Sequence, residues 1–173
     1  MLRRQAAEKR GADEPRDHAL GRSRGGFGTK IHLVSDSQGT PLAVHVTPGQ
    51  THEVAGFESV VDAVRIPQAC GRPRTRPFRL AGDKGYDVPW VRDWLRRRHI
   101  TPIIPEKHKP HGRKPGRPLV LDTDTYRRRN VIERSISWLK HARRIATRFE
   151  KLATNFLAML KLAMIQRYLR NYL

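Results

Sequence analysis

The stretch FRLAGDKGYDVPWVRDWLRRRHITPIIP, residues 78–105, decides the fold because two apolar runs flank an amphipathic segment. The first run, 78–81, has the length of a short strand and ends in the glycine-rich turn GDKGYD. Pro89 suits the first position of a helix that runs to about Arg98. The inner stripe of this helix is Val91, Trp94 and Leu95. TPIIP, residues 101–105, is then a short buried strand, so the order strand, helix, strand indicates an α/β fold.

The segments on either side continue this alternation. Alternating apolar residues predict strands over 30–36 and 42–46, joined by a turn into an antiparallel hairpin. Apolar residues at helical spacing predict three further helices, over 53–64, about 123–144 and about 155–172. We therefore expect a mixed sheet with helices on its faces. The rest is polar or rich in glycine, proline and arginine: 1–20 as a flexible segment, with 21–29 and 106–118 as loops.

Composition points to a polyanionic partner. The 173 residues include 35 Lys and Arg against 16 Asp and Glu, a formal charge of +19, with 38% hydrophobic residues. A compact domain of this charge repels itself unless it meets a polyanion, and DNA or RNA is the leading candidate. The single cysteine, Cys70, excludes a disulfide framework and fits a reducing cytoplasm. No apolar run approaches the ~20 residues of a membrane span, so we expect no membrane partner.

One face of the predicted helix over 123–144 combines a carboxylate with cations. Arg129, Glu133 and Lys140 follow Tyr126 at intervals that place all four within a sector of roughly 60°. Asn130, Ser137 and Arg144 join the same face. A carboxylate among bases suits metal-dependent phosphoryl transfer, in which the acid holds a divalent ion and the cations meet phosphates. Ordinary ion pairs on a solvent-exposed face are the alternative interpretation.

Asp83 is the second candidate for chemistry. It follows the apolar run 78–81, and carboxylates at the carboxyl ends of strands in α/β sheets lie where such sheets bind ligands. A capping or turn role is the alternative, although Asp87, which precedes a helix, is the better capping candidate. The segment GRSRGGFGTK, residues 21–30, offers arginines, hydroxyls and exposed amides that suit phosphate contact.

Together these segments resemble the DDE transposases of insertion sequences, specifically the family-five group. The resemblance spans about residues 19–173 and includes ALGRSRGGFGTKIHLVSD, PLAVHVTPGQTHEVAGFE, RLAGDKGYD and the helix that begins YRRRNVIERSISWLK. Tyr126, Arg129, Glu133 and Lys140 match the Tyr-two-Arg-three-Glu-six-Lys signature of that group at every spacing. An unrelated RNA-binding protein would leave this match unexplained.

The resemblance implies an RNase H-like fold and a metal-dependent nuclease site. Asp83 and Glu133 would be the second and third catalytic carboxylates and would hold two Mg²⁺ ions, with Mn²⁺ as a substitute. Tyr126, Arg129 and Lys140 would position Glu133 and the DNA backbone. The partner would be the ends and target of an insertion sequence, in the bacterial cytoplasm and nucleoid. The cations expected to contact this DNA are Arg22, Arg24, Lys30, Lys84 and Arg144.

The region that should hold the first catalytic aspartate departs from the family pattern. Residues 1–19 contain no apolar run that could form the first strand, and Asp13, Asp17 and Asp36 are poor substitutes. We therefore expect residues 21–173 to form a partial, N-terminally truncated catalytic domain that lacks the first strand. The missing piece would come from an upstream-encoded N-terminal half, with homo-oligomers also expected. Alone, the chain should bind metal weakly and transpose little, or serve as an inactive DNA-binding remnant or regulator.

Overall fold

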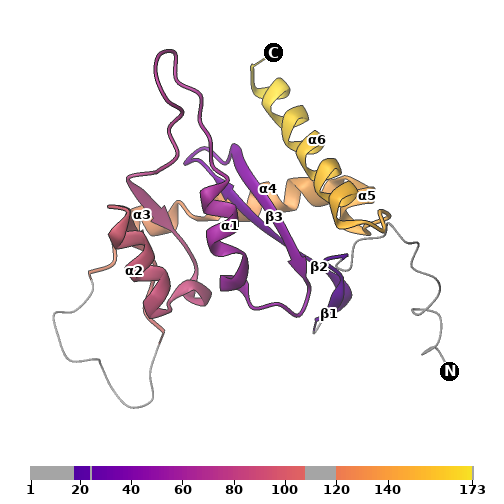
Figure 1. Ribbon diagram of the computed structural model, residues 1–173, viewed down its shortest axis with the longest axis horizontal. Coiled ribbons are helices and arrows are strands. Elements are labelled where there is room, and N and C mark those ends of the chain that lie inside the picture. Colours follow the sequence, from indigo (N-terminus) through magenta and orange to yellow (C-terminus); the bar gives the residue numbers. More distant parts are fainter. Residues whose placement is uncertain (1–17, 24, 108–119, 173) are drawn as a thin grey trace.

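The computed structural model describes residues 18–23, 25–107 and 120–172. These residues form helices and small sheets, as predicted for an α/β protein (Figure 1). The strands are β1 (Gly21–Ser23), β2 (Gly26–Ser35), β3 (Pro41–Pro48), β4 (Arg79–Ala81) and β5 (Thr101–Ile103). The α-helices are α1 (Phe57–Asp62), α2 (Pro89–Arg97), α3 (Thr123–Arg127), α4 (Asn130–His141), α5 (Arg143–Ala146) and α6 (Ala153–Tyr172). Two 3-10 helices, η2 (Glu53–Gly56) and η3 (Lys84–Tyr86), precede α1 and α2.

The predicted hairpin is confirmed and is longer than expected. β2 and β3 are antiparallel, with Ile31 opposite Val46 and Leu33 opposite Val44. The Asp36 side chain accepts hydrogen bonds from the amides of Gln38 and Thr40, which fixes the turn between the strands. Residues 21–29, predicted as a loop, instead continue the sheet: β1 pairs antiparallel with the start of β2. Gly26, with φ of +111°, makes this tight reversal possible.

The remaining strands form a second sheet. β4 and β5 are parallel, with Leu80 opposite Pro102, and α2 connects them. Pro89 is at the predicted first turn of α2. Among the described residues no ladder joins β4 to β2, so the strands do not form the single mixed sheet that we expected. The two sheets nevertheless contribute to the same hydrophobic cluster, in which Leu80 of β4 packs against a core that contains Ala43 of β3.

Helices cover both faces of the β2–β3 hairpin. Because side chains alternate along a strand, Val34 and Ala43 pack against α1 and α2, whereas Leu33 and Val44 pack against α4 and α6. Figure 1 shows α1 in front of the hairpin and α4 behind it. The buried core on the α1 side is Ala43, Phe57, Val60, Val61, Val64, Val91, Trp94, Leu95, Ile100 and Ile104. The buried core on the α6 side is Val44, Leu139, Ile145, Phe156, Leu160 and Met164.

The helix predicted over 123–144 is divided into three. Asp122 caps α3 through a 3.0 Å hydrogen bond from the Thr125 amide. Between α3 and α4 the amides of Arg129 and Ile132 bond to carbonyls three residues earlier, which is the tighter 3-10 pattern. Ala142, with ψ of 107°, is extended and ends α4. The regular helical face that we predicted from Tyr126 to Arg144 therefore exists only within α4.

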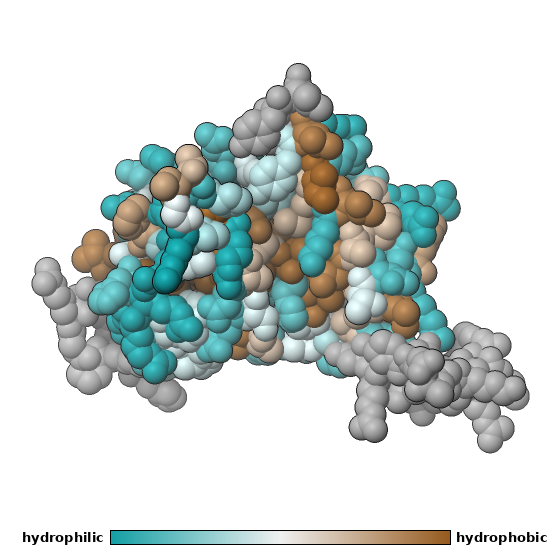
Figure 2. All heavy atoms as spheres, turned by 45° about the horizontal axis from the view of Figure 1, so that its top comes forward, coloured by the Kyte–Doolittle hydropathy of each residue, from teal (hydrophilic) through white to brown (hydrophobic). Residues whose placement is uncertain are grey.

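The last helix, α6, keeps apolar side chains on its outer face. Leu162, Ile165 and Leu169 are each more than half exposed. Figure 2 shows hydrophobic residues at the surface toward the C-terminal end of the chain. Among the described residues, no helix combines the length and apolarity that crossing a bilayer requires.

Candidate active site

Asp83 lies where the sequence predicted, just beyond the carboxyl end of β4. Its backbone is extended, and its carboxylate oxygen Oδ1 accepts a 2.8 Å hydrogen bond from the Gly85 amide. This bond caps η3, so Asp83 has the turn role that was its alternative interpretation. The same carboxylate also lies at the strand end where a ligand could bind. The side chain remains partly exposed. One oxygen is thus held in place while the other is available to a ligand.

A second carboxylate, which the sequence analysis did not single out, lies beside Asp83. It belongs to Glu53, the first residue of η2, and η2 packs directly against η3. A Cβ atom added at Gly85 would lie 2.5 Å from Oε2 of Glu53 and 2.8 Å from Oδ1 of Asp83. Gly85 therefore provides the open space that two converging carboxylates share. Glu53 is 30 residues before Asp83 in the chain, so no local spacing pattern could have paired them.

Tyr86 lies beside these two carboxylates and is largely shielded from solvent. Burial, followed by the neighbouring Glu53 and Asp83 carboxylates, raises the pKa of Tyr86 to about 12. Its ring packs against the core residue Phe57, with 5.8 Å between ring centroids. Tyr86 is therefore a neutral wall of the site at physiological pH, between the carboxylates and the core.

Asp87, expected to cap α2, has a different role. Val88 is the N-cap of α2, and its side chain makes no capping bond. The Asp87 carboxylate pairs at 2.8 Å with the buried Arg92, and it also accepts a bond from the Lys107 amide. Burial alone would raise the pKa of Asp87, but the hydrogen bonds from Lys107 and Arg92 outweigh it and hold that pKa below its usual range. Asp87 fixes the segment after η3.

Glu133 is on α4, and most of its side chain is exposed. Its carboxylate forms a 2.7 Å ion pair with Arg129, one turn earlier. The Arg129 guanidinium also lies 5.6 Å from the centre of the Tyr126 ring. Lys140 is exposed two turns after Glu133 on the same face of α4. Contacts thus join Tyr126, Arg129 and Glu133, and Lys140 lies on the same face of α4 as Glu133.

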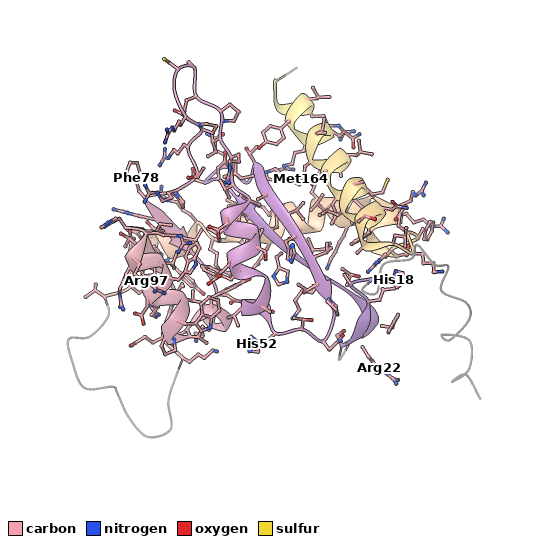
Figure 3. The ribbon with its side chains drawn as sticks, viewed as in Figure 1. His18, Arg22, His52, Phe78, Arg97 and Met164 are labelled. Carbon is pink, nitrogen blue, oxygen red and sulfur yellow. The ribbon has the colours of Figure 1, made fainter. Side chains whose placement is uncertain are left out.

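The cations expected to contact DNA are spread over the molecule. Lys84 is exposed next to Asp83, whereas the Lys30 ammonium donates a 2.6 Å hydrogen bond to the Thr51 carbonyl. Arg22 lies on β1, away from α2 and Arg97 (Figure 3). Arg144 lies on α5 rather than on the face of Glu133, because Ala142 interrupts the helix, and it pairs with Glu150 at 2.9 Å. Arg24 lies outside the described residues, as do Asp13 and Asp17.

The described residues do not assemble a complete metal centre of three or more ligands. They contain no hydrogen bond between Asp83 and Glu133. Asp83 caps η3, which contacts η2, whereas Glu133 is on α4, which contacts α5 and β2. The chemistry of the Glu53 and Asp83 oxygens nevertheless fits a hard divalent cation, which prefers carboxylate ligands. These two side chains, next to the exposed Lys84, are the part of the chain where a metal and a phosphate could meet.

The chain is similar to known proteins over most of its length. The profile of the transposase DDE domain family matches residues 5–166, and the chain belongs to this family. A putative transposase for insertion sequence element IS402 from Burkholderia cepacia is 37% identical over 136 residues, 78% of this chain and 60% of the relative. A putative transposase for insertion sequence element IS6501 from Brucella ovis is 29% identical over 147 residues, 82% of this chain and 98% of the relative. No solved structure matches the chain.

Proposed function

We propose that this chain is the catalytic part of an insertion-sequence transposase of the family-five group, and that it cleaves DNA and transfers strands with an RNase H-like core. Membership of the transposase DDE domain family supports the reaction class. The match covers 60% of the IS402 relative, so the activity of the whole protein is part of the proposal. The observation that carries it is the carboxylate of Asp83, fixed at a strand end beside the carboxylate of Glu53 and the cation of Lys84.

Each side chain has a distinct role in this proposal. Asp83 and Glu133 would hold Mg²⁺ or Mn²⁺, and Glu53 would add a carboxylate next to Asp83. When bound, the metal would activate water or a DNA 3′-hydroxyl and offset the charge that develops on the phosphate. Lys84 and Lys140 contact the phosphates beside the carboxylates. Arg129 orients Glu133 through their ion pair and is itself held by the Tyr126 ring.

Metal binding tests the carboxylate assignments without relying on turnover. Terbium luminescence, sensitised by the neighbouring Tyr86, reports occupancy, and Mg²⁺ serves as a competitor. We expect Asp83→Asn and Glu53→Gln each to weaken binding at least about tenfold, since each removes an anionic ligand. Glu58→Gln is the matched control, because Glu58 is an exposed carboxylate on α1. Equal affinities of Asp83→Asn and Glu58→Gln would contradict the proposed metal site.

A non-catalytic DNA-binding role is the second candidate function. It is favoured by the ion pair between Glu133 and Arg129, since this arginine already neutralises the carboxylate. Glu133→Gln separates the two functions in a metal-dependent cleavage assay on DNA that carries the element ends. Loss of cleavage with retained DNA affinity supports the catalytic role. DNA binding without metal-dependent cleavage by the unmodified chain supports the second candidate.

A further inference from the structure

An arm extends from the body of the molecule between α1 and β4. This arginine arm comprises residues 66–76, and Figure 1 shows it rising above the rest of the chain. Every residue from 67 to 74 is exposed. Two backbone hydrogen bonds between Ile66 and Arg74, of 2.9 and 2.8 Å, close its base. The arm is therefore an ordered projection that contributes little to the hydrophobic core.

The charge of the arm and its flanks has one sign. Residues 63–82 contain five arginines and no Asp or Glu. The arginines are Arg65, Arg72, Arg74, Arg76 and Arg79. Charges on a narrow projection are solvated on several sides, and their combined field attracts a polyanion. A duplex nucleic acid has the charge and the grooves to accept such a projection.

The backbone of the arm is stiff for an exposed segment. Pro67 and Pro73 in the arm, and Pro77 directly after it, each fix one φ angle. Gly71, with φ of +90°, makes the turn at the tip. The Arg74 guanidinium is 4.6 Å from the centre of the Phe78 ring, so this arginine braces the base. Arg72, next to the tip, forms no ion pair or cation–π contact within the described part of the chain. Its guanidinium therefore faces solvent without an internal partner.

A basic pocket lies at the foot of the arm. Its charged lining consists of Arg65, Arg76, Arg98 and Asp62, so three guanidinium groups oppose one carboxylate. Arg98 is held 3.6 Å from the centre of the Trp94 ring and is 3.9 Å from Asp62. The remaining positive charge suits a phosphate group. If the arm lay in a groove of a duplex, the phosphate backbone at the edge of that groove would lie against this pocket.

We propose that the arginine arm enters the minor groove of duplex DNA with Arg72 leading, while the basic pocket contacts a phosphate at the groove edge. Narrow A·T minor grooves concentrate negative potential and attract inserted arginines. An extended arm without a helix suits this groove, which is too narrow for a helix. Arginine enters more readily than lysine because its guanidinium is more weakly hydrated. The proposal rests on the proposed function only in taking DNA as the ligand.

The test measures binding of the full chain to short labelled duplexes by fluorescence anisotropy. Three duplexes differ at the centre: A·T pairs, G·C pairs, or inosine·C pairs, which keep the major-groove edge of G·C but lack the minor-groove amino group. We expect tighter binding to the A·T and inosine·C duplexes than to the G·C duplex. Arg72→Ala should lower affinity for the first two by about tenfold and abolish the preference. Arg72→Lys, which keeps the charge, should also lose the preference.

Arg97→Ala is the matched control, since Arg97 is exposed on α2 (Figure 3). It should lower affinity for all three duplexes slightly and equally. Thermal unfolding of Arg72→Ala should match that of the unmodified chain, because its side chain faces solvent. A preference that survives Arg72→Ala, equal effects of Arg72→Ala and Arg97→Ala, or tighter binding to duplex RNA would overturn the inference. If the unmodified chain bound no duplex, the proposed function would fail with it.

Discussion

His32 shows how one buried side chain makes the stability of this protein depend on pH. It is almost fully buried on β2, its Nε2 atom lies 2.8 Å from the Thr47 hydroxyl, and a Cβ atom at Gly56 would overlap its ring. Burial, followed by the neighbouring His45 and Lys30, lowers the pKa of His32 from 6.5 to about 4. The folded protein therefore holds a neutral imidazole over a pH range in which the unfolded chain is protonated.

The sign of the resulting pH dependence follows from proton binding. Between pH 6.5 and about 4 the unfolded chain binds more protons at this residue, so acidification favours unfolding. We expect His32 to leave the free energy of unfolding independent of pH above pH 6.5 and to lower it as the pH falls to about 4. Urea unfolding across this range measures it. His32→Gln should flatten the profile, whereas the exposed His141→Gln should leave it unchanged; identical profiles for the two variants would contradict the assignment.

At the scale of elements, a single hydroxyl ties the helix that holds Glu133 to the hairpin. Ser135 is buried on α4, and its Oγ atom donates a 2.7 Å hydrogen bond to the carbonyl of Gly39 in the β2–β3 turn. Ser135→Ala leaves that carbonyl without its partner, and we expect a loss of about 1–3 kcal/mol in the free energy of unfolding. Ser137→Ala, two residues further on the exposed side, should cost much less. Equal unfolding free energies for the two variants would show that the bond to Gly39 is not important.

The helices and strands that were predicted correctly are those with a local sequence pattern. Strand alternation in Ile31, Leu33 and Val44, the proline at the start of α2 and the carboxylate after β4 are local patterns, and the structure confirms them. The end of α4 at Ala142 has no local signal, because alanine favours helix and only the surrounding packing selects an extended residue there. The juxtaposition of Glu53 with Asp83 arises from packing of η2 on η3, which no periodicity records.

At the scale of the whole molecule, Arg148 joins the first described residues to the segment before α6. Its guanidinium donates hydrogen bonds to the carbonyls of His18 and Ala19, 130 and 129 residues earlier in the sequence. The same group lies 4.9 Å from the centre of the Phe156 ring in the α6 core. These contacts fasten the segment before β1 to the segment before α6. The planar guanidinium can hold these segments together because its several N–H donors point in different directions.

Loss of the Arg148 contacts should lower the free energy of unfolding by more than the loss of one positive charge does. We expect Arg148→Ala to lower the free energy of unfolding by about 2–4 kcal/mol, because it leaves partly buried carbonyls unsatisfied and removes packing on Phe156. Arg148→Lys should recover little, since one ammonium cannot bond in the several directions that the guanidinium serves. Arg143→Ala removes the same charge from an exposed position on α5 and should cost less than about 0.5 kcal/mol. Urea unfolding of the three variants decides the matter: if Arg148→Lys were as stable as the unmodified chain, charge alone would account for the role of Arg148, and the geometry of its hydrogen bonds would not.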